Sequence, residues 1–320
     1  MKLLVTGGAG YIGSVVTAVL REGGHQVTVL DSLVTGHRDA VPAEVEFVQA
    51  DVADNAAVRG ILAGNGFDGV LHFAALSLVG QSVQDPESYF ANNVGGSIAL
   101  VREVVAAGVP RFVFSSTAAT YGEPESIPIT EEAPTRPTSP YGASKLAVDE
   151  LLRFTAAARP LSATSLRYFN VAGAHGDIGE RHATETHLIP NVLAVPAGKR
   201  EAVDVFGTDY PTADGSAVRD YIHVVDLAKA HVRALETSDR PGHRVFNLGI
   251  GRGYSVLEVV DTVRKVTAHP VPVRESPRRA GDPATLVASS TKANAELGWS
   301  AELDLEQMVS DAWRFHQQRG

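Results

Sequence analysis

The segment Thr6-Gly-Gly-Ala-Gly-Tyr-Ile-Gly13 stands between a short apolar run and a stretch whose apolar residues have helical spacing. Glycines at a strand-to-helix turn let the backbone approach a pyrophosphate at the N-terminus of the helix. The spacing of Gly7, Gly10 and Gly13 is G-x-x-G-x-x-G, a variant of the G-x-G-x-x-G found in many dehydrogenases. This context favours a dinucleotide site over the alternative of a tight turn without a ligand.

Around this turn, the first half of the chain alternates strand and helix patterns. Strands are predicted at Lys2–Thr6, Gln26–Leu30, Glu44–Val48, Gly69–Phe73 and Arg111–Ser115. Helices are predicted at Tyr11–Glu22, Asn55–Leu62, Pro86–Ala106 and Tyr141–Ala157. Such alternation indicates parallel βαβ units, so the fold class is α/β, a doubly wound parallel (Rossmann) sheet.

The second half is less regular. Pro and Gly cluster at Gly173–Gly179, Gly207–Gly215 and His269–Pro283, which are predicted to be binding loops. No long linker or internal repeat separates the two halves. We expect residues 1–170 to form the dinucleotide-binding domain, with a return segment near 221–248, and residues 171–320 to form a smaller α+β substrate domain.

Composition excludes several classes of function. The 320 residues are 44% hydrophobic and 20% charged, as in an ordinary globular protein, and the net charge of −9 argues against nucleic acid or an anionic membrane as a partner. The chain has no cysteine, which excludes disulfides, thiolate catalysis and Cys-based zinc sites. Neither a signal peptide nor a membrane span is recognisable, so a cytoplasmic location is expected.

Further polar residues follow the predicted strands. Asp31 ends the second strand, where a carboxylate accepts the adenosine ribose hydroxyls and repels a 2′-phosphate, which favours NAD over NADP. Asp51, after the third strand, is equally well explained by an adenine contact or by a turn. Small residues in Phe73-Ala-Ala75 allow a cofactor to lie against the backbone, and Asn92-Asn93 opens or interrupts the next helix.

The catalytic signal is Tyr141-Gly-Ala-Ser-Lys145, which places a phenol and an ammonium one helical turn apart. A nearby ammonium and an oxidised nicotinamide both favour the phenolate, which makes Tyr141 a usable base. Thr117, in Ser115-Ser-Thr117 after the fifth strand, offers a hydroxyl at the carboxyl end of the sheet. For Ser115 and Ser116, the simpler explanation is that their hydroxyls form hydrogen bonds with polar groups at the end of the strand.

In this order, these motifs resemble the extended short-chain dehydrogenase/reductase family. Four long segments narrow the resemblance to the UDP-glucose 4-epimerase branch of that family: Leu71–Gly80, Leu166–Ala174, Phe206–Gly215 and Val218–Leu227. The resemblance implies that NAD stays bound while hydride passes from the sugar C4 to the nicotinamide and returns on the other face. It therefore implies reversible interconversion of UDP-glucose and UDP-galactose through a 4-keto sugar. In that reaction Tyr141 is the base, and Thr117 forms a hydrogen bond with the reacting hydroxyl. Lys145 adjusts the acidity of Tyr141 and holds the nicotinamide ribose.

The resemblance also implies two sets of contacts. Those to NAD fall on Gly7, Gly10, Tyr11, Ile12, Gly13, Asp31, Ser32, Leu33, Thr35, Gly36, Asp51, Val52, Phe73, Ala74, Ala75, Ser77, Asn92, Tyr141, Lys145 and Phe169. Those to the UDP-sugar fall on Thr117, Tyr141, Asn170, His187, Leu188, Arg219, Arg279 and Asp282. At position 77 some members of the family have a lysine, where this chain has Ser77. Arg219 and Arg279 supply local positive charge for a diphosphate.

Other functions are less favoured. A 4,6-dehydratase needs an acid pair near the strand-end threonine, where this chain has alanines, in Thr117-Ala-Ala-Thr-Tyr121. A binding protein without catalysis is disfavoured because Thr117, Tyr141 and Lys145 are all present. A net dehydrogenase would release NADH at each turnover, and sequence does not reveal how long the cofactor stays. Leu286 takes the place of a bulky aromatic that blocks N-acetyl groups in the family, so turnover of UDP-GlcNAc and UDP-GalNAc is the alternative specificity.

Two last expectations concern metals and assembly. His175, His182 and His187 are close in sequence, but no carboxylate stands at ligand spacing in a helical or strand frame, so no metal site is expected. Family members are commonly homodimers joined by the helices that contain Asn92–Ala107 and Tyr141–Ala157. A homodimer is therefore expected here too.

Overall fold

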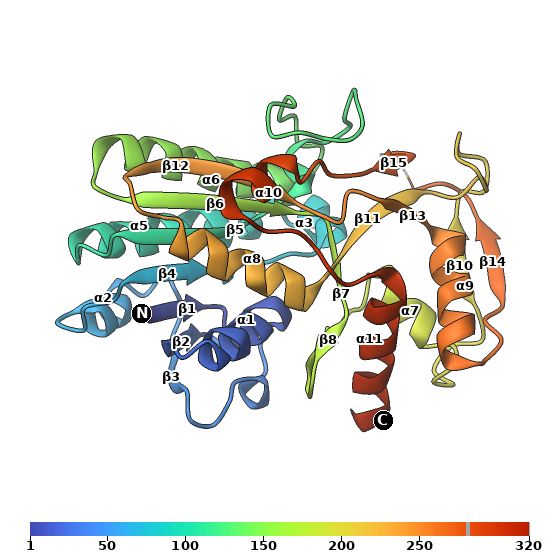
Figure 1. The fold of residues 1–320 in the computed structure, drawn as a ribbon, viewed down its shortest axis with the longest axis horizontal. Helices are drawn as coiled ribbons and strands as arrows, with labels where there is room; N and C mark the ends of the chain where they lie inside the picture. Colours follow the sequence, from blue (N-terminus) through green and yellow to red (C-terminus); the bar gives the residue numbers. More distant parts are fainter. Residues whose placement is uncertain (280–281, 320) are drawn as a thin grey trace.

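A computed structural model describes residues 1–279 and 282–319 of the chain. Its main feature is a seven-stranded, wholly parallel sheet with the order β12-β6-β5-β4-β1-β2-β3 (Figure 1). The strands are β1 (Lys2–Thr6), β2 (Gln26–Asp31), β3 (Glu46–Gln49), β4 (Gly69–His72), β5 (Arg111–Thr117), β6 (Ser162–Tyr168) and β12 (Gly242–Leu248). The order reverses between β1 and β4, which is the point where ligands bind in open parallel sheets. This confirms the predicted fold class.

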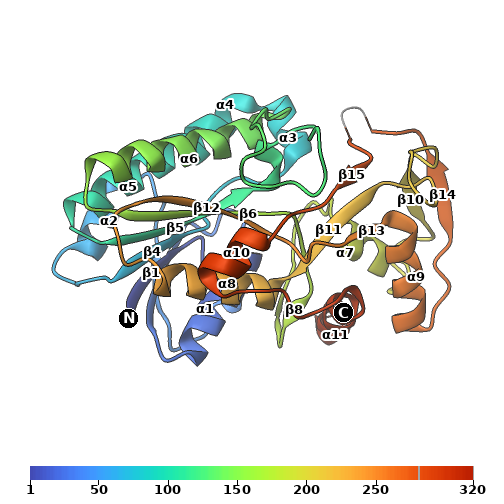
Figure 2. The same ribbon diagram turned by 45° about the horizontal axis from the view of Figure 1, so that its top comes forward.

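Helices cover both faces of the sheet, as Figure 2 shows. One face carries α1 (Tyr11–Glu22), α8 (Val224–Glu236) and α10 (Thr291–Leu297). The other carries α2 (Asn55–Leu62), α3 (Val79–Gln84), α4 (Pro86–Tyr89), α5 (Gly96–Ala106) and α6 (Pro140–Ala158). Successive strand residues enter opposite apolar clusters: Val5 and Leu71 pack on the α1 side, whereas Leu4 and Val70 pack on the α6 side. Burial on both faces explains the continuous apolar runs in the sequence.

The remaining elements form a second, smaller layer beyond the carboxyl ends of the strands (Figure 1). In it, β11 (Val218–His223) pairs with β7 (Asn170–Ala172), β13 (Gly253–Ser255) and β15 (Thr285–Leu286). Two further strand pairs are β10 (Val203–Phe206) with β14 (Val273–Ser276), and β8 (Ala174–His175) with β9 (Ile178–Gly179). A third apolar cluster forms among α7 (Leu188–Leu193), α9 (Val256–Thr267) and α11 (Leu305–Arg319).

Several predicted boundaries differ from the structure. β3 begins two residues later than predicted, and β5 extends through Thr117, so the Ser-Ser-Thr segment lies within the strand and does not follow it. The predicted helix 86–106 is interrupted by a π-helical segment at Phe90–Gly95, as Asn92-Asn93 suggested. Two of the predicted loops contain short strands, β8 and β9 in one and β14 in the other, because backbone pairing with neighbouring strands satisfies their polar groups. Short 3₁₀ turns occur at Arg38–Ala40 and Ala118–Thr120.

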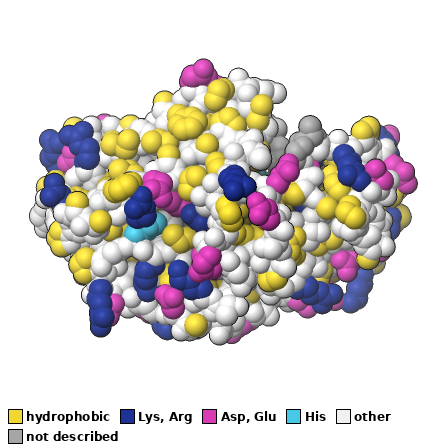
Figure 3. Space-filling model, turned by 90° about the horizontal axis from the view of Figure 1, so that it is seen from above, with side chains coloured by type: hydrophobic (Ala, Val, Ile, Leu, Met, Phe, Trp, Pro, Cys, Tyr) yellow, Lys and Arg dark blue, Asp and Glu magenta, His cyan; other side chains and the backbone are white. Residues whose placement is uncertain are grey.

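The surface in Figure 3 has acidic and basic side chains interspersed, with hydrophobic side chains between them. Within the part of the chain that the structure describes, no helix combines the length and apolar character needed to cross a bilayer.

Candidate active site

The glycine turn joins β1 to α1 and leaves no room for side chains. Gly7 has φ +72°, and a Cβ there would lie 2.4 Å from the Ala74 backbone nitrogen. A Cβ on Gly13 would lie 2.2 Å from the Gly7 carbonyl oxygen. No side chain caps the start of α1, and its first turn has no acidic residue. Because a helix N-terminus with free amides attracts anions, the turn fits the pyrophosphate of a dinucleotide.

The two strand-end aspartates differ in their surroundings. Asp31 is buried, and its carboxylate accepts hydrogen bonds from the backbone N–H groups of Ala9 (2.9 Å) and Leu33 (2.8 Å). These bonds fix the Asp31 side chain beside the glycine turn, where a ribose contact is predicted. Asp51 is exposed and accepts from Ala53 N at 2.8 Å, which is the turn interaction considered in the sequence. An adenine contact by Asp51 stays a prediction.

Asn93 links the segment after β4 to α6. Its side chain is 2% exposed, donates to Leu76 O (3.0 Å) and Ser144 Oγ (3.0 Å), and accepts from Leu76 N (2.8 Å). Ser144 immediately precedes Lys145, and residues 73–74 pack against Gly7. The glycine turn and the start of α6 are therefore joined through one continuous set of contacts. The side chain of Asn92 bonds only its neighbour, Asn93 Oδ1 (3.0 Å), among the described residues.

The predicted catalytic residues come together where β5 ends and α6 begins. Pro140 occupies the first turn of α6, and Ser139 caps that turn by accepting from Gly142 N, so Tyr141 and Lys145 stand one turn apart. The Lys145 Nζ donates to the Ser115 carbonyl oxygen at 2.8 Å. Thr117, nearly buried at the end of β5, provides a side-chain hydrogen bond to the Tyr141 phenol.

Burial dominates the protonation of this pair. It raises the pKa of Tyr141 to about 12, although the Thr117 hydrogen bond acts in the opposite direction. It also lowers the pKa of Lys145 to about 7, against the opposing effect of the Asp149 carboxylate. Without a ligand, therefore, the phenol is protonated at neutral pH and the ammonium is only partly retained.

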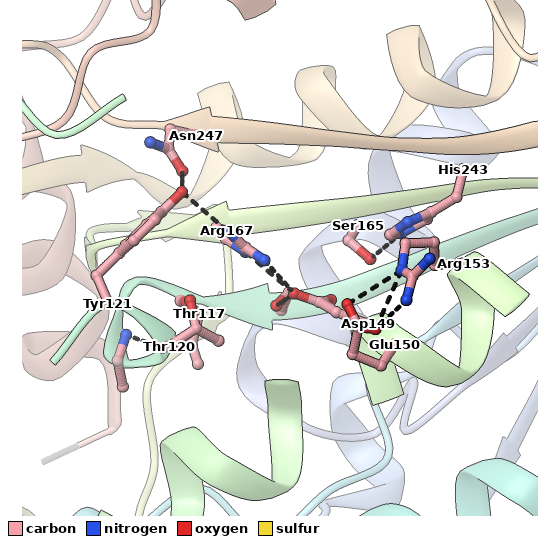
Figure 4. A network of polar contacts seen from close by, with 12 residues as sticks. Thr117, Thr120, Tyr121, Asp149, Glu150, Arg153, Ser165, Arg167, His243 and Asn247 are labelled. Carbon is pink, nitrogen blue, oxygen red and sulfur yellow. Dashed lines mark hydrogen bonds and ion pairs between the residues drawn. The ribbon is translucent and has the colours of Figure 1, made fainter. Parts of the chain in front are cut away.

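A buried polar network supports the catalytic helix (Figure 4), and sequence reasoning missed it. Asp149 accepts from Arg167 Nη2 (2.9 Å) and from Ser116 Oγ (3.1 Å). Arg167 Nη1 also donates to the Tyr121 hydroxyl (3.1 Å), which in turn donates to Asn247 Oδ1 (2.7 Å). The network ties α6 to β5, β6 and β12. The feature of the sequence that could have indicated this network is Asp149, which lies one helical turn beyond Lys145.

Apart from Thr117 and Tyr141, the predicted UDP-sugar residues lie in the second layer. Asn170 begins β7, next to Tyr221 of β11, while His187 and Leu188 stand at the start of α7. The Arg219 guanidinium forms an ion pair with Asp282, and Leu286 is directly opposite Arg219 in the β11–β15 pair. Arg279 is exposed and stacks on Phe206, 4.0 Å from its ring centroid. Sequence reasoning missed Asp220, which accepts hydrogen bonds from the N–H groups of Ala288, Ile250 and Gly251 and so fixes the segments that follow β12 and β15.

The structure corrects the reasoning about the loop histidines. His175 lies apart, against Glu22 of α1 (2.8 Å), but His182 and His187 face Glu180 and Glu185. The loop brings these carboxylates within ligand distance although no helix or strand frame does. The neighbouring carboxylates of Glu180 and Glu185 raise the pKa of His182 to about 9. For His187, burial alone would lower the pKa, but the same carboxylates raise it to about 10.

Comparisons with known proteins identify the family. A family model described as the NAD dependent epimerase/dehydratase family matches residues 3–249. The chain belongs to the NAD dependent epimerase/dehydratase family. A UDP-glucose 4-epimerase of Corynebacterium glutamicum is 58% identical over 316 residues, covering 98% of this chain and 95% of that protein.

Solved structures of UDP-glucose 4-epimerases have the same fold as this chain. A UDP-glucose-4-epimerase from Stenotrophomonas maltophila, with bound NAD and formylated UDP-arabinopyranose, superposes with a TM-score of 0.97 at 44% identity, covering 100% of this chain and 98% of that one. One from Bifidobacterium longum, in complex with NAD+ and UDP, has a TM-score of 0.94 at 40% identity and covers 99% and 98%. The resemblance found in the sequence is thereby confirmed.

Proposed function

We propose that this epimerase-family chain reversibly interconverts UDP-glucose and UDP-galactose with tightly bound NAD. The observation that carries the proposal is the convergence of Thr117, Tyr141 and Lys145 at the sheet edge, linked by contacts to the glycine turn. Relatives described as UDP-glucose 4-epimerases at 44–58% identity support this choice of substrate. Residues 1–170 with 221–248 are assigned to the cofactor, and the rest of 171–320 to the UDP-sugar.

In this mechanism Tyr141 moves one proton in each direction. The Tyr141 oxygen takes the proton from the sugar 4-hydroxyl as C4 is oxidised to a ketone, and it gives the proton back when C4 is reduced on the opposite face. NAD, when bound at the glycine turn, supplies the hydride acceptor and donor for C4. Thr117 holds the Tyr141 oxygen by a hydrogen bond, and Lys145 stabilises the phenolate. No proton or electron pair is lost over the cycle.

The test uses the purified chain with UDP-galactose and no added NAD, followed by NMR of the sugar. UDP-glucose is the expected product, which also requires that the cofactor was retained through purification. Tyr141→Phe removes the base and abolishes turnover. Tyr254→Phe is the matched control, because the Tyr254 hydroxyl makes no hydrogen bond to another described residue. Full activity of Tyr141→Phe refutes the mechanism.

We also infer a homodimer that uses the helices on the α6 side of the sheet. These helices carry exposed large apolar side chains: Val79, Val83, Phe90, Ile98 and Phe154. Such side chains gathered on neighbouring helices favour burial against a second copy. Light scattering of Phe154→Glu is expected to report a monomer. Val34→Glu, which alters an exposed valine outside these helices, is expected to leave the dimer intact. A cytoplasmic location stays a prediction.

A further inference from the structure

We propose that Glu180, His182, Glu185 and His187 form a zinc site, separate from Thr117, Tyr141 and Lys145, in which His187, also a predicted UDP-sugar contact, is a metal ligand. Each side chain offers one ligand atom, and these four atoms lie within 4.8 Å of one another. The donor set of two imidazoles and two carboxylates suits Zn²⁺, and the two histidines are separated by four residues, as in many zinc motifs. Four protein ligands leave no open position, which indicates a structural metal.

The His182 distances are close to those of tetrahedral coordination, whereas the His187 distances are shorter. The Nδ1 atom of His187 is 2.7 Å from Glu180 Oε1 and 3.0 Å from Glu185 Oε1. The Nδ1 atom of His182 is 3.2 Å from Glu180 Oε1 and 3.5 Å from Glu185 Oε2. Metal–ligand bonds of about 2.0–2.2 Å place the ligand atoms of a tetrahedron roughly 3.3–3.6 Å apart. Small side-chain movements therefore suffice to admit the ion.

Hydrogen bonding explains the position of His187, which bonds Glu185 through its backbone N–H and its ring, but not that of His182. His182 Nδ1 is buried but makes no hydrogen bond of acceptable geometry with any described residue, although Glu180 Oε1 is 3.2 Å away. Glu180 itself has only 8% of its side chain exposed, and both imidazoles point at its carboxylate. The His182 Nδ1 atom thus faces carboxylate oxygens without a well-directed hydrogen bond, which leaves it available to a metal ion.

Charge and local structure both permit the ion. Two carboxylates with Zn²⁺ and two neutral imidazoles have no net charge, as do the same carboxylates with two imidazolium ions. The segment is also held from outside the cluster: His37 Nε2 bonds Arg181 O at 3.0 Å, and the Arg181 guanidinium pairs with Asp39 at 2.8 Å. Zinc would therefore fix residues 180–187, which lead directly into α7, against the first part of the chain.

The test measures zinc in the purified chain with its bound dinucleotide. Protein treated with chelator and then desalted is titrated with ZnCl₂, and bound zinc is counted by mass spectrometry. We expect one zinc per chain. His182→Ala and Glu185→Gln each remove a ligand and should weaken binding by more than the roughly 10- to 100-fold typical for loss of an outer partner. His175→Ala is the matched control, since His175 pairs with Glu22 outside the cluster.

A second measurement does not depend on any variant folding. Co²⁺ bound to the wild-type chain is expected to show the intense visible absorption of tetrahedral coordination, and Zn²⁺ should abolish it. The proposal is overturned if wild-type protein takes up no stoichiometric zinc, if Co²⁺ shows only the weak bands of octahedral coordination, or if folded Glu185→Gln binds zinc as tightly as the His175→Ala control.

Discussion

Replacing Thr117 by valine tests how the Tyr141 base is tuned. The Thr117 hydroxyl donates a hydrogen bond to the Tyr141 oxygen, which lowers the pKa of that phenol against the effect of burial. A hydrogen bond to a charged group contributes about 1.5–3 kcal/mol. Because about 1.4 kcal/mol corresponds to one pKa unit and to tenfold in rate, Thr117→Val should lower turnover at neutral pH by about 10- to 150-fold.

The activity deficit of Thr117→Val is expected to depend on pH in a definite direction. Tyr141 acts in its deprotonated form, so kcat/KM for UDP-galactose rises with pH until the phenol has titrated. Loss of the hydrogen bond raises the phenol pKa and moves this rise to higher pH. The deficit of the variant is therefore expected to be largest at low pH and to shrink as the pH increases.

Thr117→Ser is the matched control, because it keeps a hydroxyl that donates to Tyr141 and accepts from Ala119 N, a bond of 3.1 Å in the native chain. It should retain activity within a few fold. Both variants are checked for an unchanged melting temperature before kinetics are compared. If folded Thr117→Val loses less than about threefold and its pH profile matches the wild type, the assigned role of Thr117 is wrong.

Three further predictions address cofactor, stability and specificity. Gly13→Ala places a Cβ 2.2 Å from the Gly7 carbonyl oxygen, so the turn must open; nucleotide released on denaturation should fall well below one per chain. Arg167→Met leaves the Asp149 carboxylate buried without its ion-pair partner. Urea unfolding should show that the free energy of unfolding falls by about 3–5 kcal/mol. A decrease of less than about 1 kcal/mol would contradict a stabilising role of the pair. Leu286→Tyr should abolish turnover of UDP-GalNAc and leave turnover of UDP-galactose unchanged. If the wild-type chain does not turn over UDP-GalNAc, the hypothesis that Leu286 leaves room for an N-acetyl group is wrong.

The features that sequence predicted correctly depend on short-range periodicity. The strand-turn-helix at Gly7–Gly13 is specified by neighbouring residues, because a glycine is needed wherever a Cβ would meet the adjacent backbone. Tyr141 and Lys145 share a helix face because of the helical repeat. These relations hold whatever the rest of the chain does, and so the sheet and the shared helix face of Tyr141 and Lys145 were predictable.

The features that were missed depend on residues far apart in sequence. Arg219 meets Asp282 across 63 positions, and Arg167 of β6 meets Asp149 of α6. The Glu180–His187 loop has no regular period, and its position depends partly on the distant contact of Arg181 with Asp39. Side chains in such a loop converge for reasons that spacing along the chain does not encode. This is why the carboxylates near His182 were not anticipated.

The protonation of the catalytic pair shows why the base and the cofactor must act together. With a pKa of about 12, deprotonation of Tyr141 at pH 7 costs about 7 kcal/mol, at about 1.4 kcal/mol for each unit. A unit positive charge about 4 Å away contributes about 4 kcal/mol at an effective dielectric constant of about 20. Lys145, with its pKa lowered to about 7, carries only part of such a charge. The chain alone therefore falls short of the required stabilisation. In the proposed mechanism, a bound positive nicotinamide would add its charge, and proton removal would be confined to the state in which C4 can also give up its hydride.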